Sequence, residues 1–171
     1  MTNKEDNTGK DKFEKLAGEY LTFYLDEEEY GIEILKVIEI IGLQEITPVP
    51  KTPEYVKGVL NLRGIIHPII DLKQRFSMGE IEPTKETCII IVVIEKGETN
   101  EQMGIIVDKV HEVKDIDGEV IDEAPDLGTQ FDSEFILGMA KEDDSVTILL
   151  DIEKILSKKE VEELSQISDN S

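Results

Sequence analysis

The sequence is poor in the residues that build large aromatic cores and disulfide frameworks. Its 171 residues include no Trp, one Cys, four Tyr and five Phe, so Ile, Val and Leu must form the core, and many are β-branched, which favours strands. The single Cys88 excludes an internal disulfide and suits a reducing compartment. The longest apolar run, residues 88–94, is too short to cross a bilayer, and the N-terminus lacks the apolar segment of a signal peptide. We therefore expect a cytoplasmic protein.

Cations are also scarce. The chain has 18 Lys and Arg against 39 Asp and Glu, a formal net charge of −21. A surface this acidic repels nucleic-acid phosphates and anionic lipid headgroups. The composition therefore predicts no nucleic-acid partner and no direct membrane contact. The charge either maintains solubility or helps to select partners, and composition does not decide between the two.

Few residues are suited to catalysis or metal binding. Only His67 and His111 titrate near neutral pH without a large pKa shift, and neither has a Cys or His neighbour at zinc-ligand spacing. The nucleophile-elbow, P-loop and dinucleotide-binding glycine motifs are absent from the sequence. We predict that the protein is not an enzyme and needs no cofactor or metal.

Short apolar runs separated by turn residues are the main feature that is present. They predict an all-β fold, mainly β with a few short helices, arranged as a barrel or sandwich. Strands are expected at residues 20–25, 30–34, 37–41, 59–62, 65–70, 88–94, 102–107, 110–114, 136–140 and 146–150.

The polar ends of the chain differ in pattern from this β-rich middle. Residues 1–18 predict a disordered tail, and residues 19–157 a folded domain. Ser157 and Glu160 have capping-box spacing, which predicts that residues 158–171 form a C-terminal helix and a frayed tail. A second, one-turn helix is expected at residues 52–58, where Thr precedes Pro and Gly ends the segment.

The chain also resembles itself. Residues 31–40 match residues 104–113 at a shift of 73, and blocks around Gly58 and Asp71 recur at a shift of 80. Chance similarity among Ile- and Val-rich strands is the alternative, but identical glycines and acids outside the apolar positions disfavour it. We expect a duplicated small barrel, with copies near residues 20–76 and 88–156 and a groove between them.

One turn presents a cation. In Asn61-Leu62-Arg63-Gly64, the glycine permits the positive φ of a tight turn and the Asn61 side chain can brace it. Arg63 would then be held on a rigid hairpin, from which its guanidinium could bind a partner's carboxylate or carbonyl. The alternative is an internal salt bridge to one of the many acids. In the repeat, Asp143 occupies the position of Arg63, so this hairpin has diverged where the framework has not.

These segments closely resemble the CheW family of chemotaxis coupling proteins. The similarity lies in residues 30–40 (Y-G-I-E-I-L-K-V-I-E-I), in Thr52-Pro53 and in residues 57–64 (K-G-V-L-N-L-R-G), and it continues in order from Tyr20 to Leu156. The resemblance implies two intertwined five-stranded SH3-like barrels with a C-terminal helix. It also implies a non-catalytic adaptor recruited to membrane receptor arrays.

The resemblance implies two partners: the regulatory domain of the histidine kinase CheA, and the cytoplasmic tip of methyl-accepting chemotaxis receptors. Positions that match the family's receptor-binding surface are Ile34, Glu39, Ile40, Lys57, Arg63, Cys88 and Val110. Positions that match kinase-binding or coupling residues are Val37, Gly58, Gly104 and Val113. Each aliphatic residue could instead belong to a barrel core, above all Ile40 and Val110, so Glu39 and Arg63 are the better candidates.

Other functions remain open. The domain could serve another two-component system or receptor array, or be a small-ligand-binding double barrel, although two unclustered histidines do not suggest a polar pocket. A CheV-type adaptor would need a receiver domain, for which residues 157–171 are too few, and the kinase itself would need a nucleotide-binding domain.

Overall fold

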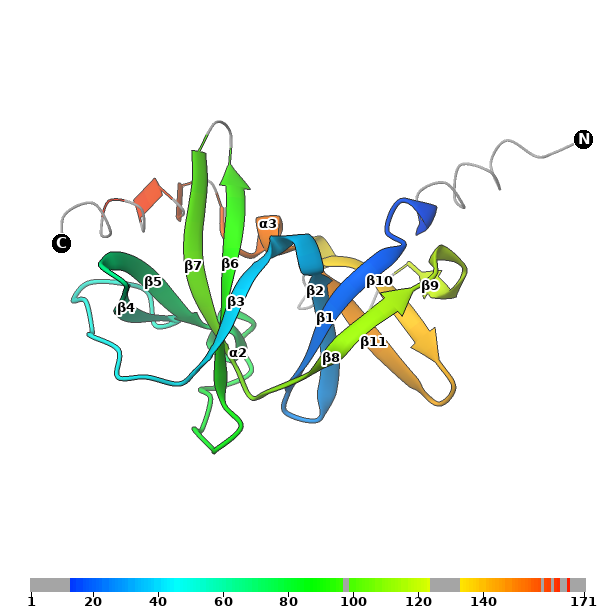
Figure 1. Cartoon of the computed structure of the whole chain (residues 1–171), viewed down its shortest axis with the longest axis horizontal. Coiled ribbons are helices and arrows are strands. Elements are labelled where there is room, and N and C mark those ends of the chain that lie inside the picture. Colours follow the sequence, from blue (N-terminus) through cyan, green and yellow to red (C-terminus); the bar gives the residue numbers. More distant parts are fainter. Residues whose placement is uncertain are drawn as a thin grey trace, which may run out of the picture.

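The protein consists of two β-sheets and a few short helices (Figure 1). The computed structural model describes residues 13–96, 99–123, 133–157, 159, 160, 162, 163 and 166. Each sheet forms one SH3-like barrel, and the two barrels lie side by side. The predicted all-β fold of two intertwined barrels is confirmed.

The β1 sheet has the strand order β8-β1-β2-β11-β10-β9. Its strands are β1 (Gly18–Leu25), β2 (Glu28–Glu33), β8 (Lys109–Ile116), β9 (Ile121–Asp122), β10 (Ile136–Glu142) and β11 (Ser145–Leu150). It has six strands where five were expected, because the two-residue β9 pairs with the outer side of β10.

The β6 sheet has the strand order β3-β6-β7-β5-β4. Its strands are β3 (Val37–Gly42), β4 (Val56–Leu62), β5 (Ile65–Asp71), β6 (Cys88–Lys96) and β7 (Thr99–Val107). The short helices are η1 (Ile34–Lys36), α2 (Leu72–Arg75), η2 (Gly118–Val120), η3 (Ser133–Phe135) and α3 (Ile152–Ile155).

Each sheet combines strands from both halves of the chain. In the β1 sheet, β2 pairs with β11 in parallel, and in the β6 sheet β7 pairs with β5 in parallel. The registers are equivalent, because Gly31 lies opposite Leu149 as Gly104 lies opposite Ile69, at the shifts of 73 and 80 seen in the sequence. Residues 20–76 and 88–156 therefore do not each form one barrel. The first two strands of either segment complete the barrel of the other.

One apolar core spans both barrels. Phe23 and Ile32 of the β1 sheet and Ile69, Ile90 and Ile105 of the β6 sheet are fully buried in the same cluster. Burial of apolar surface contributes roughly 25 cal/mol per Å². The barrels therefore stabilise one another and form a single folding unit.

A smaller apolar cluster orders part of the predicted N-terminal tail. Phe13 and Leu16 pack against this cluster, which includes Tyr20 and Ile116, and the Tyr20 hydroxyl donates a hydrogen bond of 2.6 Å to the Leu16 carbonyl. The tail prediction is therefore wrong for residues 13–18, because two spaced apolar side chains suffice to anchor them. Residues 1–12 lie outside the described residues.

The two helix predictions had different outcomes. The capping box is confirmed: the Ser157 amide donates to the Glu160 carboxylate at 2.9 Å, and the Glu160 amide donates to the Ser157 hydroxyl at 3.1 Å. The described residues that follow are helical. The expected helix at residues 52–58 is wrong. A non-helical turn forms there instead, closed by the hydrogen bond from the Val56 amide to the Pro53 carbonyl, because strand β4 begins at Val56 and pairs with β5.

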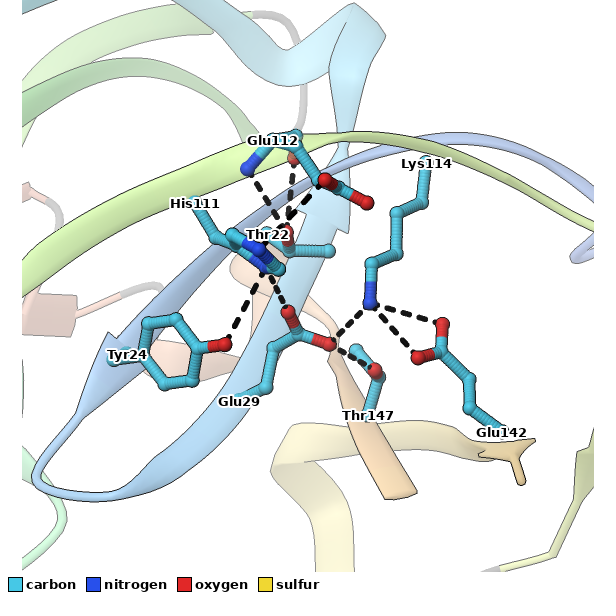
Figure 2. Close-up of polar contacts among 8 residues, drawn as sticks. All are labelled: Thr22, Tyr24, Glu29, His111, Glu112, Lys114, Glu142 and Thr147. Carbon is cyan, nitrogen blue, oxygen red and sulfur yellow. Dashed lines mark hydrogen bonds and ion pairs between the residues drawn. The ribbon is translucent and has the colours of Figure 1, made fainter. Parts of the chain in front are cut away.

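A polar network joins strands β1, β2, β8, β10 and β11 of the β1 sheet (Figure 2). Glu29 of β2 receives hydrogen bonds from Lys114 at 2.7 Å and from the Thr147 hydroxyl, and it also contacts His111. Lys114 binds Glu142 at 2.9 Å as well. Burial disfavours the charged Glu29, but the bonds from Lys114, Thr147 and His111 outweigh burial and lower the pKa of Glu29 below its ordinary value.

Gly58 allows the β6 barrel to close. Thr47, which follows β3, exchanges backbone hydrogen bonds of 2.9 and 3.0 Å with Val59 of β4. Gly58 has φ +140°, and a Cβ atom added there would lie 2.0 Å from the Thr47 carbonyl oxygen. Any side chain at position 58 would therefore push the two closing segments apart.

We expect Gly58→Ala to lower the free energy of unfolding by at least about 1–3 kcal/mol, from backbone strain and the contact with Thr47. Gly64→Ala is the matched control, because Gly64 also has positive φ but a Cβ atom added there would meet no atom within 4 Å. Urea titration of both variants checks this. Equal losses would show that the Thr47 contact is unimportant.

We expect Glu29→Gln to lower the free energy of unfolding at pH 7 by roughly 1–3 kcal/mol, because Lys114 loses its charged acceptor. Since the folded pKa of Glu29 is lowered, its contribution is present above the ordinary glutamate pKa of 4.5 and is lost as the pH falls through the folded value. The difference between wild type and variant should therefore shrink in acid. A difference that is constant from pH 7 to pH 3, or equal to that of the exposed Glu28→Gln, would contradict this account.

Candidate protein-interaction site

Arg63 lies at the tip of the β4–β5 hairpin. Leu62 and Ile65 form the last strand pair, so Arg63 and Gly64 are the two loop residues, with φ +52° and +87°. Positive φ at both residues is typical of a type I′ turn. The Asn61 side-chain oxygen accepts a hydrogen bond of 2.8 Å from the Gly64 amide, which confirms the predicted brace.

The Arg63 guanidinium is exposed but has an internal partner. It forms an ion pair with Glu39 of β3, while 73% of the Arg63 side chain remains accessible. β3 and β4 are the two edge strands of the β6 sheet, and closure of the barrel brings them together. The bridge between Thr47 and Val59 lies at this closure. The internal salt bridge left open by the sequence therefore forms, and it joins the two strongest candidates for partner binding. Exposed ion pairs contribute only about 0.2–1 kcal/mol, so a partner's carboxylate can replace Glu39 at little cost.

Glu39 and Ile40 face opposite sides of β3. Val37, Glu39 and Ile41 are partly buried, whereas Ile38 and Ile40 are exposed. Ile40 is 43% accessible, so it is not a core residue. Ile40 therefore presents apolar surface, but on the other face of the strand from the carboxylate that binds Arg63.

Four further candidates are partly buried. Ile34, Val37, Cys88 and Val110 pack against the main core. Cys88 lies opposite Gly42 of β3, and its thiol donates to the Glu86 carbonyl at 3.1 Å. Val110 belongs to the other barrel, where it lies opposite Phe23. For Val110 the core alternative is therefore largely correct, although part of its side chain reaches the surface.

The remaining candidates lie apart from Arg63. Lys57 is at the other end of β4, where it pairs with Glu80 at 2.6 Å. Val113 is exposed on β8 of the other barrel. Gly58 and Gly104 are buried, and a Cβ atom at Gly104 would approach Ile69 to 2.6 Å. The two glycines therefore shape the surface from beneath and cannot contact a partner directly.

Sequence reasoning missed several exposed aliphatic residues, three of which lie in or beside η1, β3 and the Arg63 turn. Leu35 in η1 is 89% accessible, Ile65 beside Arg63 is 61% accessible, and Ile38 is exposed on β3. A clue was present, since residues 34–41 are apolar at positions that would face both sides of a strand. Such a pattern indicates either a fully buried strand or an exposed apolar face, and only the strand order shows that β3 is at an edge.

The described histidines have structural partners. His67 is buried, and its Nδ1 lies 3.0 Å from the Ile65 carbonyl oxygen while its Nε2 lies 3.1 Å from the Gln102 side-chain oxygen. His111 belongs to the Glu29 network. Among the described residues, no group of three or more His, Cys, Asp or Glu side chains is placed to hold a metal ion. No helix in this part of the chain is long and apolar enough to cross a membrane.

A polar cleft of about 770 Å³ is lined by both barrels and their connections. Its lining includes Asp26, Glu27 and His111 from the β1 sheet side, and Lys73 and Glu82 from the β6 sheet side. Most of its charged groups are carboxylates, which disfavours anionic ligands.

Comparison with known proteins places this geometry in a family. Residues 19–160 match the family model of the CheW-like domain. The chemotaxis protein CheW of Klebsiella aerogenes is 40% identical over 152 residues, covering 86% of this chain and 89% of the relative. That of Treponema pallidum is 36% identical over 149 residues, covering 86% of each.

A solved structure agrees with the sequence comparison. The scaffolding protein TtCheW from Thermoanaerobacter tengcongensis superposes with a TM-score of 0.73 at 40% identity, over 82% of this chain and 88% of that one. Family match, sequence identity and fold all agree over the same segment. The chain belongs to the CheW family of chemotaxis adaptor proteins.

Proposed function

We propose that this adaptor couples methyl-accepting chemotaxis receptors to the histidine kinase CheA by binding both, without catalysing a reaction. It acts in the cytoplasm and is recruited to membrane receptor arrays through the receptors. Membership of the CheW family supports the adaptor role. The two partners follow from the resemblance described above.

The observation that carries the proposal is the exposed guanidinium of Arg63. It is held on a two-residue turn, in a chain with only 18 cations and a net charge of −21. A fixed planar guanidinium can bind a carboxylate through two parallel hydrogen bonds. Because Glu39 already orients it, little side-chain entropy is lost when a receptor carboxylate takes over.

Exposed aliphatic residues supply apolar contact area for the receptor. We assign Ile38 and Ile40 of β3, together with Ile65 beside Arg63, to the surface that receives the receptor's helical tip. Ile34, Cys88 and Val110 extend this surface where they are partly exposed. A helix laid on an apolar surface with charges at its edge is a common mode of peptide recognition.

The kinase partner is proposed to bind as one barrel against another. The CheA regulatory domain shares this fold in the family, so an edge strand with exposed aliphatic residues is a suitable contact on both sides. Val113 on the edge strand β8 provides such a residue here. Val37, Gly58 and Gly104 would support coupling through packing. Lys57, with its partly exposed ammonium group, is assigned to the receptor-binding residues.

We expect Arg63→Ala to fold normally, because an exposed ion pair contributes only about 0.2–1 kcal/mol. Assembly of a receptor–kinase complex should weaken about tenfold or more, as at other interface arginines. Co-sedimentation of receptor-tip fragments, kinase and adaptor measures assembly, and thermal unfolding measures stability. Arg63→Lys, which keeps the charge but loses the planar fork, should give an intermediate result.

Lys141→Ala is the matched control. Lys141 is also an exposed cation with an internal partner, Asp122 at 3.0 Å, but it lies on β10 of the other barrel. Its removal should leave assembly unchanged. A loss of stability in Arg63→Ala that accounts for its loss of binding would make Arg63 a structural residue and contradict the proposal.

A further inference from the structure

Two short connections join the barrels. Residues 34–36 (η1) lead from β2 to β3, and Asp108 leads from β7 to β8 (Figure 1). At the repeat shift of 73, Lys36 corresponds to Lys109 and Leu35 to Asp108. Both connections therefore lie at equivalent places in the duplicated fold, and each has a polar contact that includes an ion pair.

The first contact, here the Glu153 clasp, consists of Glu153, Lys36 and Glu95. Glu153 lies in α3, directly after β11 of the β1 sheet. Its carboxylate pairs with Lys36 of the connection at 2.8 Å and accepts a hydrogen bond of 2.9 Å from the Glu95 amide of β6. The bond with Glu153 raises the pKa of Lys36. The clasp thus ties one barrel to the other across the connection.

The second contact, here the Lys73 clasp, consists of Lys73, Asp26 and Asp108. Lys73 lies in α2, directly after β5 of the β6 sheet, and is buried. Its ammonium binds Asp26 in the β1–β2 turn at 2.5 Å, which raises the pKa of Lys73. The Asp26 amide donates a hydrogen bond of 2.6 Å to Asp108 of the connection.

The clasps are equivalent in position but opposite in polarity. Position 73 corresponds to 153 at the shift of 80, and Asp26 corresponds to Glu95, because β1 and β6 are equivalent strands. The helix supplies an anion in one clasp and a cation in the other. Each clasp therefore involves a helix, the end of a strand and a connection, and these three places are equivalent in the two barrels. The charges that form the ion pair differ between the two clasps. A general excess of acids does not explain this coincidence.

We propose that the two clasps set the relative orientation of the barrels, and that loosening them weakens coupling between partners bound to different barrels. The shared apolar core is far stronger than either clasp, so it holds the barrels together. Apolar contact is non-directional, however, and permits small rotations that a fixed ionic contact does not. None of the clasp residues belongs to the proposed partner surface. The coupling part of this inference rests on the proposed function.

The orientation can be measured in the isolated protein. Spin labels are placed at Asn100 and Ser145, which are exposed on different barrels, after Cys88→Ala removes the native thiol. Double electron–electron resonance then reports the distance distribution between barrels. We expect Lys73→Met with Glu153→Gln to broaden or shift this distribution while the protein stays folded. Lys36→Met alone should give a smaller change of the same kind.

Because the two clasps are equivalent in position, the charge arrangement of the first can be introduced at the second by mutation. Lys73→Glu with Asp108→Leu gives positions 73 and 108 the side chains of Glu153 and Leu35, with Lys109 in the place of Lys36 and Asp26 in the place of Glu95. This variant should keep a narrow distribution, whereas Lys73→Glu alone places a carboxylate beside Asp26 and Asp108 and should broaden it. Lys141→Met, which removes an ion pair within one barrel, is the matched control and should change nothing.

Receptor-dependent kinase activation provides the functional measurement. We expect kinase activation to fall about fivefold in the variant that combines Lys73→Met with Glu153→Gln, while the affinity for each separate partner stays unchanged. The proposal would be overturned if the distance distributions of the double variant and of Lys36→Met were the same as that of the wild type. A broadened distribution without loss of kinase activation would also overturn it. If even the wild type failed to support activation, the proposed function would fail, while broadened distributions would still establish the structural role of the clasps.

Discussion

Two short parallel strand pairings determine the architecture of this protein. β2 with β11 and β5 with β7 join strands that are far apart in the chain, and each pairing extends over only three residue pairs. Because of them, neither barrel can form from one half of the sequence. The shared apolar core, the two connections and the clasps beside them all follow from this exchange of strands. An adaptor built in this way cannot separate into independent domains without unfolding.

The surface properties follow from the same architecture. Closure of the β6 barrel places Arg63 beside Glu39, and the ion pair between them fixes the direction of the guanidinium. Such a pair contributes little to stability, so the proposed exchange of Glu39 for a partner's carboxylate would cost little. Exposed Ile38, Ile40 and Ile65 would be an aggregation risk in an uncharged protein. The net charge of −21 offsets this risk by repulsion between copies, which leaves the apolar surface available to other partners.

Local chemistry was predictable from the sequence. The Arg63-Gly64 turn, its Asn61 brace and the Ser157–Glu160 capping box depend on residues within three positions of each other. The helix expected at residues 52–58 does not form, because this segment depends on pairing between strands and not on neighbouring residues alone. Pairing of β4 with β5 overrides the local signals of Thr52 and Pro53. The repeat was visible, but sequence shifts alone could not show which copy supplies each strand. The Arg63–Glu39 contact and the burial of Gly104 depend on that assignment.

The candidate residues divide into exposed residues, which can contact a partner, and buried residues, which can act only through packing. Arg63 and Ile40 are exposed as a contact residue must be, whereas Gly58 and Gly104 were matched to the family by sequence and proved to be buried. Family resemblance identifies positions that matter, but it does not say whether they act by contact or by packing. Leu35 lies within the segment that resembles the family but was not among the candidates, and at 89% it is the most accessible large apolar residue in the described part of the chain.

Under the proposed function, one molecule binds receptor and kinase at the same time. Sedimentation velocity of the full chain, mixed with a receptor-tip fragment and the CheA regulatory domain in the absence of nucleotide, tests it directly. We expect a species containing all three proteins at concentrations of tens of micromolar or below, and we expect it to disappear when the adaptor is omitted. Binary complexes alone, with each partner displacing the other, would contradict it.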